Sequence, residues 1–404
     1  MTTSRPIHPH GGYTRPAGSR PRRADTLALL LLPFRGGDYG YNDEGGVLVD
    51  RTADGVDLNL IWAEAQAVMA AYNGRRSKLA ALVSFSTTAV ADPIPQAVGG
   101  DDFEEASEYG VPKGIRNAPD ALLMGYDFKD YDLASRFTWK FLRDASAEQV
   151  RDLLNRALEA DNRKVTGSIL RRLFDNSQGA NEFQHPVYPL WTGLDGMVPP
   201  PYAGQEFTSA DSHMLASGAA SLDPGDLLDL VNAVQSKGYG IGQGTRLLLL
   251  MHPHEAEIAA TFRRGTEVNG VDSKYDFIPS QSAPAYLTPD NVVGQVAPGE
   301  FGGMEVLGSW GPAWIVPSYL LPMGYVACVA TGGPNSTMNP VAFRQHTNTA
   351  YQGLRIIPGR DQRYPLQESF FARGFGTGIR HRGAAAVLQV TVGSTYTPPT
   401  WAWS

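Results

Sequence analysis

Residues 146–174 read SAEQVRDLLNRALEADNRKVTGSILRRLF and predict one long amphipathic helix. Ser146 and Gln149 form a capping-box pattern, because the hydroxyl accepts a backbone N–H and the amide three residues later reaches back. Apolar residues recur at helical spacing, at Val150, Leu153, Leu154, Ala157, Leu158, Val165, Ile169, Leu170, Leu173 and Phe174. Charged residues fill the other face, at Arg151, Asp152, Arg156, Glu159, Asp161, Arg163, Lys164, Arg171 and Arg172. At about 1.5 Å per residue the helix spans roughly 40 Å, which suits the spine of a domain.

The bulk composition is that of a globular protein. The chain has 404 residues, of which 42% are hydrophobic and 19% charged, so two or three domain-sized units are expected. The formal net charge of -7 argues against a dedicated nucleic-acid binder, which normally carries a basic face. The single cysteine, Cys328, lies in the apolar run 325–330 and is expected to pack as a small apolar group. No disulfide framework is possible within the chain, which suits a reducing cytoplasm.

The first thirty-odd residues form a basic, Pro/Gly-rich arm. Its charged residues are Arg5, Arg15, Arg20, Arg22, Arg23 and Arg35, against one acid, Asp25. The run TLALLLLPF at 26–34 superficially resembles a signal peptide, but it is short, starts late and lacks a small-residue cleavage site. We expect a buried extended segment there and no membrane span anywhere in the chain.

A charged loop is expected between two predicted strands. A helix at 56–72, stopped by Asn73-Gly74, precedes predicted strands at 79–91 and 121–142, which look like two arms of one long hairpin. The connection at 92–120 is too long for an ordinary turn, so it is either a functional loop or disordered. Its acids cluster before its bases, at Asp101, Asp102, Glu104, Glu105 and Glu108 and then Lys113 and Arg116. This segregation of charge favours a loop that binds a partner.

A compact mixed α/β unit is predicted at 221–331. Asp223-Pro224 opens a helix as cap and first-turn proline, and a strand at 245–251 and a helix at 253–262 follow. Further strands are predicted at 304–307, 314–316 and 325–330. The chain then ends in two strands, 368–372 and 383–392, placed around a glycine-rich turn.

Motifs for chemistry are weak throughout the chain. The glycines at 238–244 come after a helix and before a strand, whereas a phosphate-binding loop needs strand, glycines and helix in that order. The glycines at 374–378 are expected between strands, and no P-loop, nucleophile elbow or CxxC occurs. His252, His254 and Glu257 offer metal-type side chains, but an ordinary helix start explains them better. The sequence therefore predicts no catalytic residue, no cofactor and no metal site.

The order of elements resembles that of the Hong Kong 97 capsid fold. YPLQESFFARGFGTGIRHRGAAAVLQV at 364–390 resembles the C-terminal strand pair of major capsid proteins from tailed bacteriophages, especially those infecting actinobacteria. RLLLLMHPHEAEIAATF at 246–262 resembles the strand and helix that open the axial domain of such subunits. MGYVACVATGG at 323–333 resembles a later strand of the same domain. The resemblance covers nearly the whole chain and rests on order more than on identity.

The resemblance implies an α+β fold with several parts. These are an N-terminal arm and linker at 1–55, a helix leading into the extended loop at 56–78, the extended loop, a long β-hairpin, at 79–142, a peripheral domain with the spine helix at 143–220, an axial domain at 221–331, and a return to the peripheral domain with C-terminal strands at 332–404. It implies that the loop contacts a neighbouring subunit through Asp101, Asp102, Phe103, Glu104, Glu105, Glu108, Tyr109, Lys113 and Arg116. In the arm, Arg20, Arg22 and Arg23 are expected to face the shell interior or a neighbour. Some relatives cross-link a loop lysine to a neighbour, but Lys113 is more simply a solvated charge.

The function that the resemblance implies is that of a structural subunit. Its copies would form hexamers and pentamers of an icosahedral phage capsid around double-stranded DNA, which they contact without sequence specificity. A separate scaffolding protein and a portal are implied partners, a cement or minor capsid protein is a further one, and the place is the virion, after assembly in the host cytoplasm. An encapsulin-type, cargo-enclosing shell is an alternative. A secreted glycan-binding protein or hydrolase is disfavoured because a signal and a tuned carboxylate pair are missing.

Overall fold

The long helix predicted at 146–174 is present in the computed structural model as α6 (Ala147–Phe174). The structure describes residues 50–74, 77–95, 121–134, 137–242, 244–281, 296–360, 363 and 365–401. The capping box is confirmed, since Ser146 Oγ accepts from the N–H of Gln149 at 3.3 Å and Gln149 Oε1 accepts from the N–H of Ser146 at 2.9 Å. The cap fixes where the helix starts.

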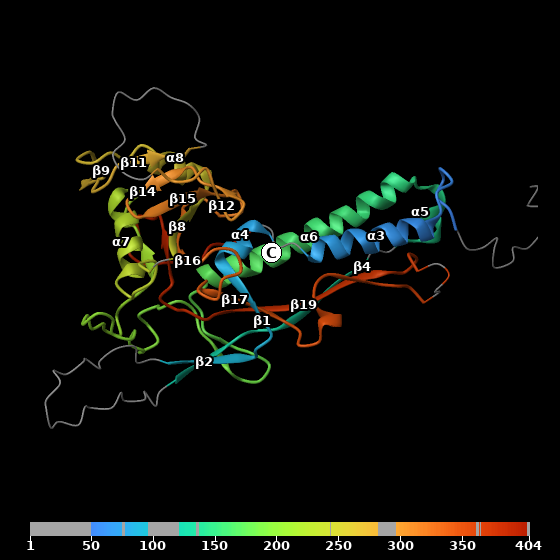
Figure 1. Ribbon diagram of the computed structural model, residues 1–404, viewed down its shortest axis with the longest axis horizontal. Coiled ribbons are helices and arrows are strands. Elements are labelled where there is room, and N and C mark those ends of the chain that lie inside the picture. Colours follow the sequence, from blue (N-terminus) through green and yellow to red (C-terminus); the bar gives the residue numbers. More distant parts are fainter. Residues whose placement is uncertain are drawn as a thin grey trace, which may run out of the picture. The chain divides into compact units, whose positions relative to one another are not determined.

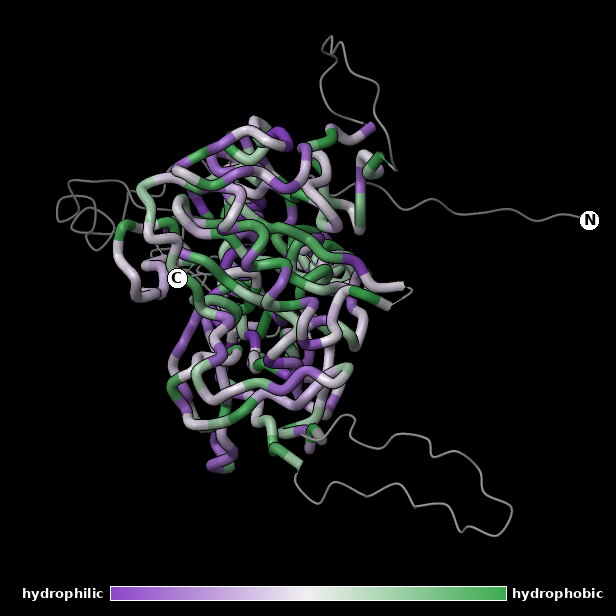
Figure 2. The backbone as a smooth tube through the Cα atoms, turned by 90° about the vertical axis from the view of Figure 1, so that its left-hand side faces the viewer, coloured by the Kyte–Doolittle hydropathy of each residue, from purple (hydrophilic) through white to green (hydrophobic). Residues whose placement is uncertain are grey.

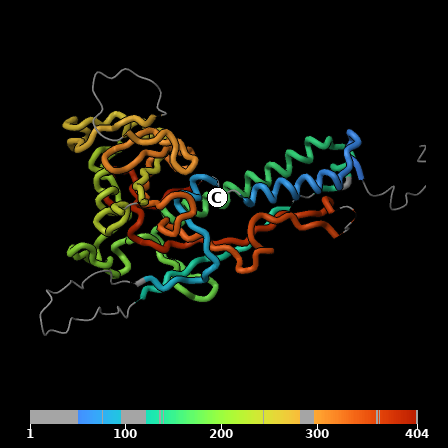
Figure 3. Tube along the Cα trace, in the orientation of Figure 1, coloured from blue at the N-terminus to red at the C-terminus, as the bar shows by residue number. Residues whose placement is uncertain are grey.

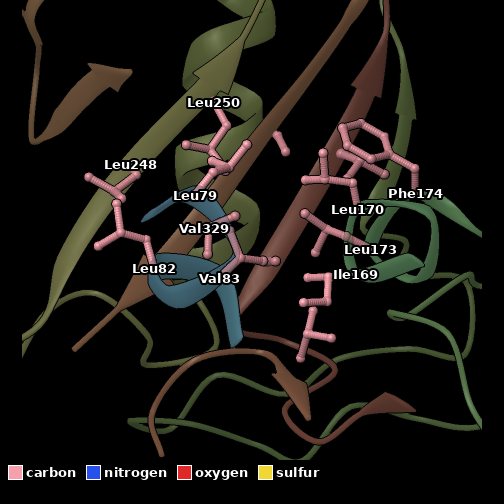
Figure 4. Close-up of a cluster of buried hydrophobic side chains, with 14 of the residues drawn as sticks. Leu79, Leu82, Val83, Ile169, Leu170, Leu173, Phe174, Leu248, Leu250 and Val329 are labelled. Carbon is pink, nitrogen blue, oxygen red and sulfur yellow. The ribbon is translucent and has the colours of Figure 1, made fainter. Parts of the chain in front are cut away.

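The C-terminal half of α6 is buried in the larger of the two main hydrophobic cores of the described residues. Ile169, Leu170, Leu173 and Phe174 are fully buried there. Figure 4 shows them beside side chains of α4 (Lys78–Val83), which packs against α6. One expectation for α6 is wrong, because Asp161 is only 8% exposed and does not lie on the solvent face. Its burial is possible because Tyr72 and Arg373 both donate hydrogen bonds to it.

Helix α3 (Leu58–Asn73) lies beside α6 (Figure 1). Asp57 caps it by accepting from the N–H of Asn59 at 2.8 Å, and the helix ends at Asn73, as the Asn-Gly pair predicts. Leu58, Ile61, Ala65 and Met69 form its buried face. A salt bridge of 2.8 Å between Arg151 and Glu64 joins the exposed edges of the two helices.

Two segments that we predicted as strand are short helices. Residues 79–83 belong to α4, and residues 139–142 belong to α5 (Trp139–Asp144). Short apolar runs do not distinguish a buried strand from a buried helix, so packing decides. The side chain of Thr138 caps α5 by accepting from the N–H of Phe141, and all of Leu79–Val83 is buried.

A five-stranded sheet forms the platform under α6. Its order is β1 (Ser84–Thr87), β17 (Val341–Gln345), β19 (Phe370–Ile379) and β18 (Arg355–Ile357), and β4 (Lys129–Ala134) also pairs with β19. Strands β4 and β19, far apart in sequence, run antiparallel side by side (Figure 3). Strand β1 is parallel to β17, and the other pairs are antiparallel.

The glycines at 374–378 lie inside β19 and not in the turn that we predicted. A Cβ on Gly376 would lie 1.5 Å from the backbone oxygen of Asp127, and one on Gly374 would lie 2.5 Å from Oδ1 of Asp130. The glycines therefore allow a close approach of the neighbouring chain, a role that glycine also has within strands.

A seven-stranded sheet carries the second core. Its order is β11 (Phe277–Pro279), β14 (Gly308–Trp310), β15 (Ala313–Pro317), β8 (Arg246–Met251), β16 (Tyr325–Thr331), β20 (Ala385–Gln389) and β7 (Met214–Ala216). Leu248 and Leu250 of β8 enter the core shared with α6, whereas Leu247 and Leu249 enter the core beneath α7 (Pro224–Gln235). The sheet is thus buried on both faces, and hydrophobic stretches run through the interior in Figure 2.

Several shorter elements complete the described structure. They are α8 (Pro253–Ala259), the 3-10 helix Thr349–Tyr351, and the strand pairs β5 (Gly179–Ala180) with β6 (Pro186–Val187), β9 (Glu267–Val268) with β10 (Val271–Asp272), and β12 (Glu300–Phe301) with β13 (Met304–Glu305). The predicted helix starts at Asp223 and Pro253 are confirmed. Across the described ranges, no helix is both long enough and apolar enough to cross a membrane.

Candidate functional site

The β2–β3 hairpin is the described base of the charged loop. Strand β2 (Ala91–Pro95) pairs antiparallel with β3 (Ala121–Gly125), from Ala91 opposite Gly125 to Pro95 opposite Ala121 (Figure 1). Residues 96–120 connect the far ends of these strands. The predicted loop residues Asp101, Asp102, Phe103, Glu104, Glu105, Glu108, Tyr109, Lys113 and Arg116 lie outside the described residues, as do Arg20, Arg22 and Arg23 of the arm. The structure therefore defines how the loop is held at its base.

A small apolar cluster anchors the hairpin. Met124 and Tyr126, at and just after the end of β3, are buried against Phe85, Tyr188 and Ala342. Phe85 belongs to β1 and Ala342 to β17, so this cluster ties the hairpin to the five-stranded sheet. Full burial of an apolar side chain of this size contributes about 1.5–3 kcal/mol, so a few such contacts hold the base in place.

The side chain of Asn181 holds the base of the β2–β3 hairpin with four hydrogen bonds. Its Nδ2 donates to the backbone oxygen of Val90 at 3.1 Å and to that of Tyr126 at 3.3 Å. Its Oδ1 accepts from the N–H groups of Phe183 at 3.0 Å and His185 at 2.9 Å. One buried amide thus joins both strands of the hairpin to the turn that follows α6.

Two arginines complete this polar base. Arg344 donates from Nη1 to the oxygen of Tyr126 at 3.0 Å, and its Nη2 lies 2.7 Å from Glu182. Arg380 lies 3.7 Å from Asp92, which accepts from the hydroxyl of Tyr126 at 2.7 Å. Burial, together with the bond to Asp92, raises the pKa of Tyr126, so its hydroxyl stays a donor. These hydrogen bonds and ion pairs hold the base of the hairpin rigidly. We call the residues that make them, Asn181, Arg344 and Arg380 together with Arg382 described below, the joint of the loop.

Arg382 holds the crossover chain that follows. Its Nε donates to the backbone oxygen of Pro189 at 2.9 Å, and its guanidinium lies 3.9 Å from the ring centre of Trp191. Asp195 accepts a further, short bond from the same guanidinium. The proline-rich crossover is therefore bound to the start of the final strand by one buried arginine.

The remaining buried ionisable groups also serve structure. Asp161 accepts from the hydroxyl of Tyr72 at 2.8 Å and from Nη1 of Arg373 at 2.6 Å, which links α3, α6 and β19. Burial raises the pKa of Asp161 despite these bonds. His213 lies against the oxygen of Ala385 through Nδ1 at 2.6 Å, and its complete burial lowers its pKa to about 4. Tyr72 and Arg373 also border a hollow of about 370 Å³, where their bonds to Asp161 hold them in place.

The weak motifs for chemistry take up ordinary structural positions. His252 caps α8, with Nδ1 accepting from the N–H of His254 at 3.2 Å, and Glu255 accepts from the N–H of Gly324 at 2.8 Å. Among the residues that the structure describes, no group of histidine, cysteine or carboxylate side chains is arranged to hold a metal ion. Cys328 is fully buried as expected, and burial raises its pKa, which keeps the thiol protonated.

Sequence reasoning did not find the residues that hold the hairpin. Asn181, Arg344, Arg380 and Arg382 stand in no recognisable motif and come from segments far apart in the chain. The acidic loop was visible in the sequence because its charges are consecutive. Its joint was not visible, since its parts meet only after both strands pair with the sheet.

Several solved structures are similar to most of the chain. A chain from Mycobacterium phage Patience is 39% identical, covers 89% of this chain and 97% of its own length, and superposes with a TM-score of 0.67. A chain from Gordonia phage Cozz is 14% identical, covering 95% and 98%, with a TM-score of 0.33. The SrpI encapsulin of Synechococcus elongatus is 12% identical, covering 79% and 89%, with a TM-score of 0.38. No protein-family model and no curated protein matches the chain.

Proposed function

The chain belongs to the tailed-bacteriophage major capsid proteins of the Hong Kong 97 fold, and from that premise we propose how its parts build a shell. The observation that carries the assignment is the 39% identity to the phage Patience chain over 97% of that chain. The protein is a shell subunit of a phage capsid and is part of the virion. Its role is structural, since a shell needs broad contacts between copies and not a substrate cleft.

We propose that the extended loop joins one subunit to the next. Within the predicted range 79–142, the loop is the part that leaves the body at the β2–β3 hairpin, because α4, β1, β4 and α5 belong to the body. The base of the hairpin is held by the buried Asn181 and by Arg344, so a loop leaving from it has a defined direction. The loop's charges, Asp101 to Glu108 on one side and Lys113 and Arg116 on the other, then pair with a neighbouring copy and set its register. Phe103 and Tyr109 supply apolar contacts at the same interface.

The finer assembly plan is a proposal as well. Copies form hexamers and pentamers through the axial domain at 221–331, while the peripheral domain with α6 and the arm at 1–55 joins neighbouring copies. Assembly takes place in the host cytoplasm with a separate scaffolding protein and a portal, and a cement or minor capsid protein is a further partner. Packaged DNA is contacted without sequence specificity, which fits a net charge of -7.

Electron microscopy of the purified chain at high concentration, with and without its scaffolding partner, tests the proposed function. Closed icosahedral particles are expected. A protein that stays monomeric under all these conditions would contradict it. The content of particles from infected cells separates a virion from a cargo-enclosing shell, because the first contains DNA and the second a protein.

Replacing residues 95–119 with a short Gly/Ser turn tests the loop. We expect a soluble subunit with circular dichroism near that of the parent, because every residue of the described hydrophobic cores is kept. It should form capsomers at most and no closed shell. Normal closed particles from this variant would show that the loop does not join subunits.

A further inference from the structure

Around β4, β19 and β18, one face of the five-stranded sheet is covered by no α-helix of the described residues. Along β19, Phe371 and Phe375 and the intervening Arg373 point to α3 and α6, as the bond from Arg373 to Asp161 shows. Alternate residues of a strand point to opposite faces, so Ala372 and Gly374 point away from the helices. The register places Asp132 of β4 opposite Ala372, with Arg355 of β18 on the other side.

A groove runs along this uncovered face. One hollow of about 490 Å³ lies over Ala372, between Asp130 and Asp132 on one wall and Arg355 and Tyr351 on the other. A second hollow, of about 600 Å³, shares Asp132 with the first and extends to Thr138 at the start of α5. The first hollow lies over the small side chain of Ala372, and the larger side chains of Asp132, Arg355 and Tyr351 form its walls. Asp130 and Phe128 lie over the neighbouring Gly374.

The acidic wall lacks partners within the described part of the chain. Asp130 and Asp132 are both exposed, and the adjacent Lys129 pairs with Asp127 instead, at 3.5 Å. Glu368 adds a third exposed carboxylate at the end of the groove. Exposed carboxylates next to aromatic rings form a site suited to arginine, because guanidinium groups both pair with carboxylates and stack on rings.

On the wall opposite the carboxylates, one guanidinium of the protein itself, that of Arg355, lies over an aromatic ring. Arg355 lies 5.0 Å from the ring centre of Tyr351, and its buried Nε has no acceptor among the described residues. Phe370, 37% exposed, and Phe128 present further aromatic surface in the same hollow. The groove therefore offers rings and carboxylates to an extended chain that carries cations.

We infer that this groove binds the arginines of the N-terminal arm, Arg20, Arg22 and Arg23, from the same chain or an adjacent copy. The inference rests on the proposed function. The first 25 residues contain five arginines and one acid, so the arm complements the acidic wall. Residues 96–120 carry an excess of acids and are disfavoured as the occupant.

Chain length and backbone preference agree with this assignment. The backbone oxygen of Asp50 accepts from the N–H of Leu58, and Ala53 bonds Ala145 at the end of α5, so the described chain begins near the groove's α5 end. The 27 residues back to Arg23 reach up to about 90 Å when extended. Pro16 and Pro21 favour an extended backbone, which fits a groove along a sheet.

A cysteine pair tests the contact directly in assembled particles. Asp132→Cys combined with Arg22→Cys should form a disulfide on mild oxidation, and gel mobility separates a link within one chain from a dimer. The native Cys328 is fully buried and does not interfere. Asp272→Cys, an exposed aspartate on β10, combined with Arg22→Cys is the matched control. We expect at least about a fivefold higher cross-linked fraction than in the control, in line with the upper value of an exposed charge pair.

Charge reversal provides an independent test. Asp130→Arg with Asp132→Arg should lower the yield of closed particles by about fivefold at low salt, as should Arg22→Asp with Arg23→Asp. Combining all four should restore at least half of the parent yield. If the parent forms shells but the cysteine pair gives no cross-link and the fourfold variant restores no yield, the groove assignment is wrong while the proposed function stands. The same holds if Asp132→Cys cross-links more strongly with Lys113→Cys than with Arg22→Cys. A parent without shells counts against the proposed function instead.

Discussion

Replacing Asn181 by alanine should loosen the loop without unfolding the subunit. The change removes four hydrogen bonds at a residue that is 3% exposed. The two carbonyls that lose a donor keep another, because Val90 accepts from the N–H of Tyr126 and Tyr126 accepts from Arg344. The N–H groups of Phe183 and His185 lose their side-chain acceptor, although Phe183 is exposed and water replaces it there.

The magnitude follows from this count. A buried donor left unpaired costs about 1–3 kcal/mol, and the other lost bonds contribute about 1 kcal/mol each at most. We therefore expect the Asn181→Ala variant to lose about 1–6 kcal/mol, in the lower half of that range because three of the four bonded groups keep or find another partner, against a total of about 5–15 kcal/mol for a typical domain. That loss leaves the subunit folded.

The assay has a stability and a local component. Chemical denaturation of the unassembled subunit gives the first. Amide hydrogen exchange at Ala91, Asp92 and Ile94, the residues of β2 that carry a backbone N–H, and at 121–125 gives the second. Exchange in these strands should rise more than exchange in α6, and the yield of closed shells should fall. Asn59→Ala, on the exposed side of α3, is the matched control and should behave like the parent. Uniform protection with unchanged shell yield in the Asn181 variant would refute the idea that this joint directs the loop.

Three further predictions concern the body of the subunit. Gly376→Ala should prevent folding, because its Cβ would overlap the Asp127 oxygen, whereas Gly179→Ala, with open space around it, should give the parent's soluble yield. Because the pKa of His213 is about 4 when folded and 6.5 is its ordinary value, only the unfolded chain gains this proton between those pH values. Lowering the pH from 7 to 4 should cost about 3 kcal/mol of unfolding free energy more in the parent than in His213→Asn, as pH-dependent denaturation would show. Leu154→Ala should lower the free energy of unfolding by about 2 kcal/mol, measured by thermal unfolding. This is the low end for leucine, because Leu154 already borders a small hollow between α3 and α6. An unchanged melting temperature would show that this face of α6 is wrongly assigned.

The parts of the fold that sequence predicts best are those with local signals. Helix α6 is predictable because its cap and its apolar period agree over 28 residues. The starts of α7 and α8 are predictable for the same reason, since Asp223-Pro224 and Pro253 place the first turn. In each case the information lies within one continuous segment of the chain.

The errors fall where tertiary contacts decide the local structure. Residues 79–83 are apolar in either conformation, and their docking on α6 makes them helical. The glycines of β19 look like a turn until Asp127 is seen against Gly376. Asp161 fits the charged face of its helix by spacing, but Tyr72 and Arg373 draw it inside.

The same distinction explains why the sequence predicts a charged loop but not the residues that hold its base. A loop that binds a neighbour keeps its charges in one continuous segment, where they remain exposed to a partner. The joint connects the β2–β3 hairpin to the rest of the subunit. Its residues and the apolar residues beside them therefore come from β1, β17, the turn after α6 and the segment before the final strand. The joint consists of buried hydrogen bonds, so each of its side chains bonds backbone or side-chain groups of another segment that would otherwise be buried without a partner. We therefore expect the direction in which a subunit extends its loop to depend on residues such as Asn181 and Arg344, more than a hundred positions apart. Variation at these positions should change shell geometry without altering the loop itself.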